Sequence, residues 1–228
     1  PVGTTTVVWT VTDVNGNTAT CNQAVTVTDN QNPTITCPSD ITINADAGQC
    51  GAVVSTLGTP TTSDNCGVAS VVNNHSSTSY PVGITTVVWT VTDVNGNTAT
   101  CNQTVTVTDN QNPTITCPSN ISVNAATGSC SATVSTLGTP TTSDNCGVAS
   151  VTNNYSSSVY LVGVTTVVWT VTDVNGNTAT CNQTVTVTDN QNPTITCPTN
   201  ISVNAATGSC SATVSMLGTP TTSDNCGV

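Results

Sequence analysis

The sequence predicts an all-β protein of tandem immunoglobulin-like antiparallel sandwiches, each about 80 residues long and stapled by disulfides. The first reason is a near-identical repeat every 80 residues, so that 81–148 and 161–228 agree at 64 of 68 positions. Tandem identity of this kind indicates one small domain that has been copied. The second is the alternation of apolar and polar residues, which is typical of strands with one buried face. The third is a set of 12 cysteines that fall at four positions of the repeat.

Five short strands are expected in the first part of the repeat. Each is a run rich in β-branched or alternating residues between turn residues. The strands are Thr34–Pro38, Ile41–Asn44, Gly51–Leu57, Val68–Asn73 and Ser79–Val82. The polar segment 59–65 is expected to be a loop.

The longest strands are expected to close the repeat as a hairpin over 85–93 and 98–108. Asn95-Gly96 between them predicts a type I′ turn, in which both central residues have positive φ. A tryptophan lies on the inward face of the first strand, so we place its three copies in the core: Trp9, Trp89 and Trp169. Seven short strands punctuated by turns indicate an immunoglobulin-like sandwich.

The boundary between repeats is expected just after Thr28, where the longest strand ends and Pro33 opens the next one. Proline suits the first position of an edge strand because it cannot donate to a ladder. We therefore predict complete domains at 29–108 and 109–188. Residues 1–28 would be the C-terminal part of a preceding domain, and 189–228 the N-terminal part of a following one. We expect a segment of a longer array; the alternative is polymerisation, with the two partial domains completing each other by strand exchange.

The charge balance excludes several classes of partner. The chain has no Lys or Arg, and its 11 acidic residues are all Asp, giving a net charge of −11. Nucleic-acid binding and attachment to anionic membranes both need basic residues, so neither is expected. No apolar run is long enough to insert into a membrane. Without Glu or Lys, and with a single His, no nucleophile–base pair can be assembled, so we expect no enzymatic activity.

The order of motifs resembles the HYR (hyalin repeat) domain. The matching stretches are Pro33-Thr-Ile-Thr-Cys-Pro38, Asp40-Ile-Thr-Ile-Asn44, Gly48-Gln-Cys-Gly51, Ser63-Asp-Asn-Cys-Gly67, Tyr80-Pro-Val-Gly83 and the run from Thr90 to Cys101. The resemblance covers the whole chain. It implies an extracellular immunoglobulin-like module, often in tandem, that is associated with adhesion and extracellular matrix and has no shared catalytic activity.

Four cysteines per repeat indicate two disulfides per domain and an oxidising compartment, with zinc as the alternative. Three pairings are possible. The first and last strands run side by side in many immunoglobulin-like folds, which favours Cys37–Cys101 together with Cys50–Cys66. The equivalent pairs further along are Cys117–Cys181, Cys130–Cys146 and Cys210–Cys226.

Three aspartate positions recur in every repeat, and strand direction places them at one pole of the domain. Asp29 lies in the linker, Asp64 in the loop 59–65 after the strand Gly51–Leu57, and Asp93 in the hairpin loop. Three carboxylates with amide and backbone oxygens suit Ca²⁺. We expect a dissociation constant of about 10⁻⁴–10⁻³ M, as in other extracellular modules. The alternative is that these residues only form turns. The candidate ligands are Asp29, Asn30, Asn32, Asp64, Asp93, Asn95, Asp109, Asn110, Asn112, Asp144, Asp173, Asn175, Asp189 and Asp224.

Taken together, the sequence predicts a structural protein of the extracellular space or cell surface. We expect a stiff stalk, fibre or filament with junctions rigidified by calcium, and copies of itself as its partners in an array. The alternative is an adhesin whose repeats bind an extracellular glycan or a matrix protein.

Overall fold

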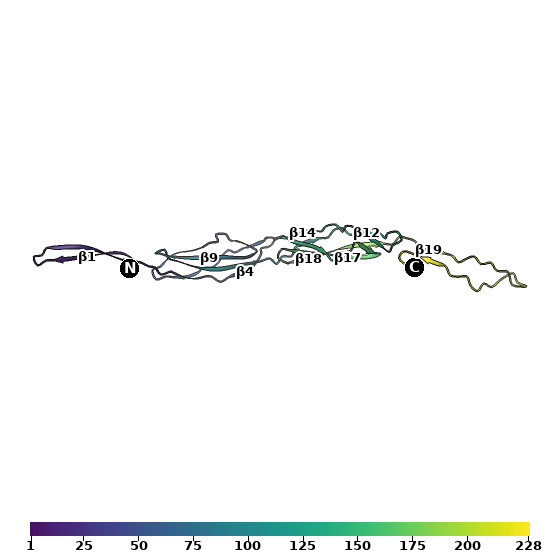
Figure 1. The fold of residues 1–228 in the computed structure, drawn as a ribbon, viewed down its shortest axis with the longest axis horizontal. Coiled ribbons are helices and arrows are strands. Elements are labelled where there is room, and N and C mark those ends of the chain that lie inside the picture. The colour runs from purple at the N-terminus through teal and green to yellow at the C-terminus, as the bar shows by residue number, and fades with distance from the viewer. The chain divides into compact units, whose positions relative to one another are not determined.

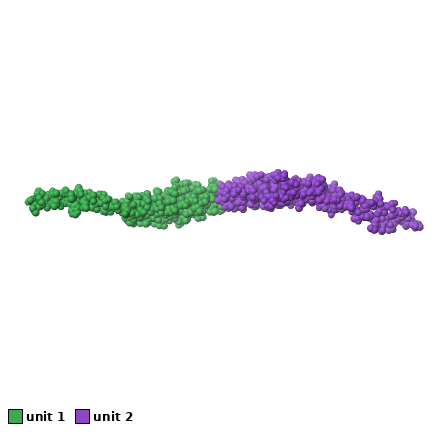
Figure 2. Space-filling model, in the orientation of Figure 1, with its two compact units in different colours: residues 1–110 green, residues 111–228 purple.

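The computed structural model describes residues 1–228, and all of its regular elements are β-strands (Figure 1). The chain divides into two compact units, residues 1–110 and residues 111–228 (Figure 2). No helix in the structure has the length and apolar character that crossing a membrane would require. Each unit contains one complete sandwich domain of about 80 residues, so the predicted fold class is confirmed.

Unit 1 begins with a hairpin that pairs with no other strand, and the sandwich domain follows it. Its strands are β1 (Gly3–Thr12), β2 (Thr18–Val27), β3 (Thr34–Thr36), β4 (Ile41–Asn44), β5 (Gly51–Val53), β6 (Thr61–Ser63), β7 (Val68–Asn73), β8 (Ser79–Pro81), β9 (Gly83–Asp93) and β10 (Thr98–Thr108). The four-stranded sheet has the order β4-β10-β9-β7, and the pairs β3-β6 and β5-β8 provide the other strands.

Unit 2 repeats this arrangement and ends in a short two-stranded pair. Its strands are β11 (Thr114–Thr116), β12 (Ile121–Asn124), β13 (Ser131–Thr133), β14 (Thr141–Ser143), β15 (Val148–Asn153), β16 (Val159–Leu161), β17 (Gly163–Asp173), β18 (Thr178–Thr188), β19 (Thr194–Thr196) and β20 (Thr221–Ser223).

One strand pairing in each domain departs from the expected antiparallel pattern. β3 pairs with β6, but after the Cys37-Pro38 step the chain crosses to the other sheet, where β4 runs parallel to β10 with Ile41 opposite Val105. The first strand of the domain is therefore split between two sheets, because proline interrupts the ladder at that point.

The core of the first domain lies between the sheets and contains the inward residues of β9 and β10. Val87 and Val105 are fully buried, Trp89 is 8% exposed, and Tyr80 from β8 is fully buried. The copy of this tryptophan in the β1–β2 hairpin differs: Trp9 is 59% exposed. The prediction that all three tryptophans are core residues is therefore wrong for Trp9, because β1 and β2 pair only with each other.

A buried glutamine joins the layers of each domain. Gln103 is fully buried; its Oε1 accepts the indole N–H of Trp89 at 3.0 Å, and its Nε2 donates to the carbonyls of Ser39 and Leu57, each at 2.8 Å. Gln183 makes the equivalent bonds in the second domain. Every polar atom of this amide group has a partner, as buried polar groups require.

Two local predictions need correction. The segment expected to be a loop contains β6, a three-residue strand without the apolar alternation that would reveal it. The β9–β10 connection is not a type I′ turn, since Gly96 has φ of 95° but no residue other than glycine has positive φ. The Asp93 carboxylate instead accepts the N–H groups of Asn95 and Asn97, which holds a longer loop with glycine in the left-handed position.

Of the two disulfides predicted for each repeat, the structure contains the one between the first and fourth cysteines and not the one between the second and third. Cys37–Cys101 and Cys117–Cys181 are present, with Cα–Cα distances of 5.8 and 5.7 Å. The predicted pairs Cys50–Cys66, Cys130–Cys146 and Cys210–Cys226 are wrong: Cys130 is bonded to Cys226, Cys66 and Cys210 are unpaired, and Cys50 and Cys146 are each in a disulfide.

The reason is that the second and third cysteines of a repeat lie at opposite ends of the domain. Near Cys50, Ala45 donates to the carbonyl of Thr108 at the end of β10, whereas Gly67, next to Cys66, accepts from Val94 near the start of β10. An 11-residue strand spans about 36 Å. A disulfide needs Cα atoms within about 7 Å.

Candidate metal site at the domain entrance

Three loops bring the recurrent aspartates together at the entrance of the first domain. Asp29 follows β2, Asp64 follows β6 and Asp93 ends β9. The N–H of Val94 donates to the carbonyl of Gly67 at 3.0 Å, which holds the hairpin loop against the loop that carries Asp64. Asn97 Nδ2 lies 3.4 Å from the carbonyl of Asp29 and connects the hairpin loop to the linker.

The three carboxylates converge closely enough to share one ion. One oxygen from each of Asp29, Asp64 and Asp93 lies within 4.8 Å of the others, and Asp93 is 2% exposed. Asp29 and Asp64 are half-buried. This is the juxtaposition that strand direction predicts.

Hydrogen bonds occupy one side of the group and leave the other open. Asp64 Oδ2 accepts the N–H groups of Cys66 at 2.7 Å and Gly67 at 3.0 Å, and Asp29 Oδ1 accepts that of Gln31 at 3.1 Å. Asp64 Oδ1 and Asp29 Oδ2 are buried, and neither accepts a hydrogen bond from a protein N–H group. Turn formation therefore accounts for only one oxygen of each of these two residues.

Asp93 is held in its ionised form. Burial raises the pKa of Asp93, but the side-chain and backbone hydrogen bonds from Asn97, followed by that from Asn95, outweigh burial and leave the pKa below its usual value. The Cys66 thiol is affected in the opposite direction. Its hydrogen bond with Asp29, then burial, then the charges of Asp29, Asp64 and Asp93 raise the pKa of Cys66.

The asparagines predicted as ligands do not join the group in the same way. The side chains of Asn30, Asn32 and Asn95 are exposed, and no side-chain contact places them on the carboxylates. Asn97, which is outside the predicted ligand set, donates to Asp93 Oδ2 at 2.7 Å. The amide side chain that organises the site is thus the one after the glycine, and the repeated Asn-Gly-Asn triplet is the sequence signal for it.

Unit 2 shows the same local chemistry. Asp173 accepts from the backbone of Asn175 and Asn177, and its pKa is lowered for the same balance of causes as that of Asp93. Asp144 Oδ2 accepts from Cys146 and Gly147, while its Oδ1 is buried and accepts no hydrogen bond.

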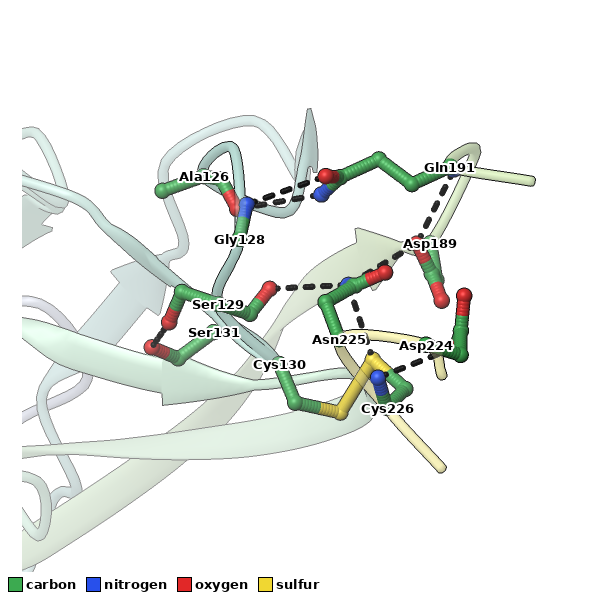
Figure 3. The surroundings of a disulfide bond; sticks show 10 residues. All are labelled: Ala126, Gly128, Ser129, Cys130, Ser131, Asp189, Gln191, Asp224, Asn225 and Cys226. Carbon is green, nitrogen blue, oxygen red and sulfur yellow. Dashed lines mark hydrogen bonds between the residues drawn. A yellow bond between two sulfur atoms is a disulfide. The ribbon is translucent and has the colours of Figure 1, made fainter. Parts of the chain in front are cut away.

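The remaining predicted ligands have the following positions. In unit 1, Asp109 is 5% exposed and Asn110 is exposed; in unit 2, Asn112 and Asn175 are exposed. At the end of unit 2, Asp189 Oδ1 accepts from Asn225 Nδ2 at 3.2 Å, and Asp224 immediately precedes Asn225 in the loop after β20 (Figure 3). Asp224 Oδ1 is again buried without a hydrogen bond.

The family follows from the sequence comparison. The model of the HYR domain matches the chain twice, at residues 28–107 and 108–187. The chain belongs to the HYR domain family. The predicted resemblance is thus confirmed. A comparison of the HYR chain with curated proteins found no match.

The solved structures that match this HYR chain have low sequence identity to it. A protocadherin gammaB7 EC3-6 cis-dimer structure is 16% identical, with a TM-score of 0.34, and the alignment covers 87% of this chain and 61% of that one. An Antarctic bacterial adhesin described as Ca²⁺-stabilised and ice-binding is 18% identical over 85% and 59% of the two chains, with a TM-score of 0.27. The human desmocollin-1 ectodomain is 11% identical over 89% and 50%, with a TM-score of 0.27. The chain therefore spans about half to three fifths of these structures, and at such scores they carry no argument about its fold or function.

Proposed function

We propose that this chain is a structural segment of an extracellular stalk or filament, in which Ca²⁺ binds at the entrance of each HYR domain and restrains the linker. The proposal is supported most directly by Asp29, Asp64 and Asp93, whose carboxylates converge within 4.8 Å in a chain without Lys or Arg. In such a stalk or filament, the partners of each domain are further copies of the same repeat.

Charge repulsion favours a cation at this site over turn formation alone. Two carboxylate oxygens about 5 Å apart repel each other by roughly 3 kcal/mol at an effective dielectric constant of 20. Three pairs contribute, and the sequence has no Lys or Arg to offset them. Ca²⁺ would fit because it takes six to eight oxygen ligands, including carboxylates, backbone carbonyls and water.

A bound cation would act on the junction through Asp29. This residue lies in the linker, whereas Asp64 and Asp93 belong to loops of the following domain. Coordination of all three would fix the direction in which the chain enters the domain. The disulfides Cys37–Cys101 and Cys117–Cys181 fit an oxidising, extracellular location, where millimolar-affinity calcium sites are common.

Thermal unfolding of the full chain in EDTA and in 10 mM Ca²⁺ tests the proposal. A dissociation constant of 10⁻⁴–10⁻³ M predicts about 1.4–2.7 kcal/mol of added stability. For a domain of this size that corresponds to a rise in Tm of roughly 6–20 °C. The variant carrying Asp64→Asn and Asp144→Asn keeps an oxygen acceptor for the loop N–H groups but loses one carboxylate per domain, so the calcium effect should disappear.

Asp13 provides the matched control. In the β1–β2 hairpin its carboxylate makes the same local bonds as Asp93, accepting from Asn15 and Asn17, but it is exposed and outside any carboxylate group. Asp13→Asn should leave the calcium effect unchanged. If calcium does not raise Tm in the natural chain, the aspartates only form turns. Glycan-array binding by such a chain would then favour the adhesin.

A further inference from the structure

The Cys130–Cys226 disulfide crosses from one repeat into the next. Its two cysteines are 96 residues apart, which exceeds the 80-residue repeat, and their Cα atoms are 4.8 Å apart. Cys130 lies in the turn between β12 and β13 of the complete domain, and Cys226 follows β20 in the next segment (Figure 3). Cys117–Cys181, by contrast, closes a loop within one repeat.

Hydrogen bonds on both sides of the disulfide hold the next segment against the turn that carries Cys130. Asn225 Nδ2 donates to the carbonyl of Ser129 at 3.0 Å, directly beside the disulfide. Gln191 spans the same turn: its Oε1 accepts the N–H of Gly128 at 2.9 Å, and its Nε2 donates to the carbonyl of Ala126 at 3.2 Å (Figure 3). Two separate parts of the next segment therefore dock on one turn.

Both halves of the contact recur with the same local geometry elsewhere in the chain. The turn around Cys210 has Ala206 donating to Ser211 and Ser209 donating to Ala206, like the turn that carries Cys130. In the loop of Cys66, as in that of Cys226, the preceding aspartate accepts the cysteine N–H. The connection therefore uses structures that each repeat forms by itself.

We propose that the Cys130–Cys226 disulfide limits the length to which the chain can be pulled, because it gives tension a covalent route from one repeat to the next that bypasses the strands between them. The inference deepens the structural role proposed above and rests on it for its use in an array. The covalent route itself needs no calcium.

The separations give the size of the effect. Cys117 and Cys226 are 109 residues apart, about 360–390 Å when fully extended. With Cys117–Cys181 alone, the shortest covalent route is that disulfide and 45 residues, about 160 Å. With Cys130–Cys226 the route is 13 residues and one disulfide, about 50 Å.

In an array in which every repeat is joined this way, the covalent route is much shorter than the chain itself. Each repeat would contribute only the 16 residues between its second and third cysteines, Cys130 and Cys146 in the second domain, and one disulfide. Those residues span about 55 Å at full extension, compared with about 260–290 Å for 80 residues. Unfolding of a domain would then release less than about 55 Å, because the tethered residues cannot extend further.

Single-molecule pulling on the full chain in EDTA tests this inference, with handles attached to azide-bearing residues at the exposed positions 116 and 228. The variant carrying Cys130→Ser and Cys226→Ser should reach a maximum extension about 110 Å greater than the natural chain, because 32 more residues enter the route. The control carrying Cys117→Ser and Cys181→Ser should show no added length, since the shorter route does not use that bond.

Maximum extension at high force depends on the covalent route and not on whether a variant folds, so misfolding does not obscure the result. Mass spectrometry of non-reduced peptides first verifies which cysteines are joined in each sample. Equal extensions for the natural chain and the Cys130/Cys226 variant, or a longer chain after loss of Cys117–Cys181, would overturn the proposal. Because EDTA is present throughout, failure of the calcium proposal would leave these outcomes unchanged.

Discussion

Replacing Gln103 by leucine tests how the layers of an HYR domain are held together. The side chain of Gln103 is fully buried, and its amide joins Trp89 on β9 to the carbonyls of Ser39 and Leu57. Leucine has a similar volume but no polar atoms. The substitution therefore leaves one indole N–H and two carbonyl groups without partners, while adding little steric strain.

The expected cost follows from those three groups. An unsatisfied buried donor or acceptor costs about 1–3 kcal/mol, and the leucine recovers part of this through its apolar surface. We expect Gln103→Leu to lower the free energy of unfolding of its domain by roughly 3–5 kcal/mol. A domain of about 80 residues has a total of about 4–12 kcal/mol, so the loss is large.

Guanidinium denaturation of the non-reduced chain, followed by tryptophan fluorescence, measures this cost. A variant with both Gln103→Leu and Gln183→Leu affects both complete domains and simplifies the transition. Gln23 supplies the matched control, because it accepts from Trp9 at 2.8 Å in the exposed β1–β2 hairpin. Gln23→Leu should cost less than about 0.5 kcal/mol. A loss below about 1 kcal/mol for Gln103→Leu would show that the hydrogen bonds of this amide do not hold the layers together.

Two further predictions concern titration. The lowered pKa values of Asp93 and Asp173 contribute stability above the usual aspartate pKa of about 3.9, and this stability is lost as pH falls through the lower folded-state values. The guanidinium concentration at the denaturation midpoint should therefore decrease as the pH is lowered below about 4. A midpoint that stays constant down to pH 2 would contradict this. Because its pKa is raised, the Cys66 thiol should react with iodoacetamide at pH 8 more slowly than the exposed thiols of Cys21 and Cys210. The substitution Asp29→Asn should make Cys66 react faster. Equal rates at the three thiols, measured by mass spectrometry, would show that the aspartates do not act on Cys66.

The strand pattern could be predicted from the sequence because period-2 alternation and turn residues are local signals. β9 and β10 form where the alternation predicts them, with Val87, Trp89 and Val105 on the buried face. β6 was missed because Thr-Thr-Ser has no apolar face. Gln103 shares the parity of Cys101 and Val105, but it could not be predicted as a core residue, because a polar side chain gives no apolar signal and its burial depends on partners in other loops.

The aspartate group was predictable because strand direction alone decides which loops share a pole. The oxygens that remain open, Asp29 Oδ2 and Asp64 Oδ1, could not be predicted, because side-chain hydrogen bonds decide them. The pairing of Cys130 with Cys226 was missed for a different reason. The second cysteine of one repeat meets the third cysteine of the next repeat across the junction, and the spacing within a single repeat carries no signal for that contact.

Isothermal titration of Ca²⁺ into the full chain is the measurement to make first, because it detects ion binding at the carboxylate group without relying on unfolding. We expect binding with a dissociation constant of about 10⁻⁴–10⁻³ M, abolished in the variant carrying Asp64→Asn and Asp144→Asn and retained in Asp13→Asn. No binding by the natural chain at millimolar Ca²⁺, or equal binding by the variant without Asp64 and Asp144, would contradict it.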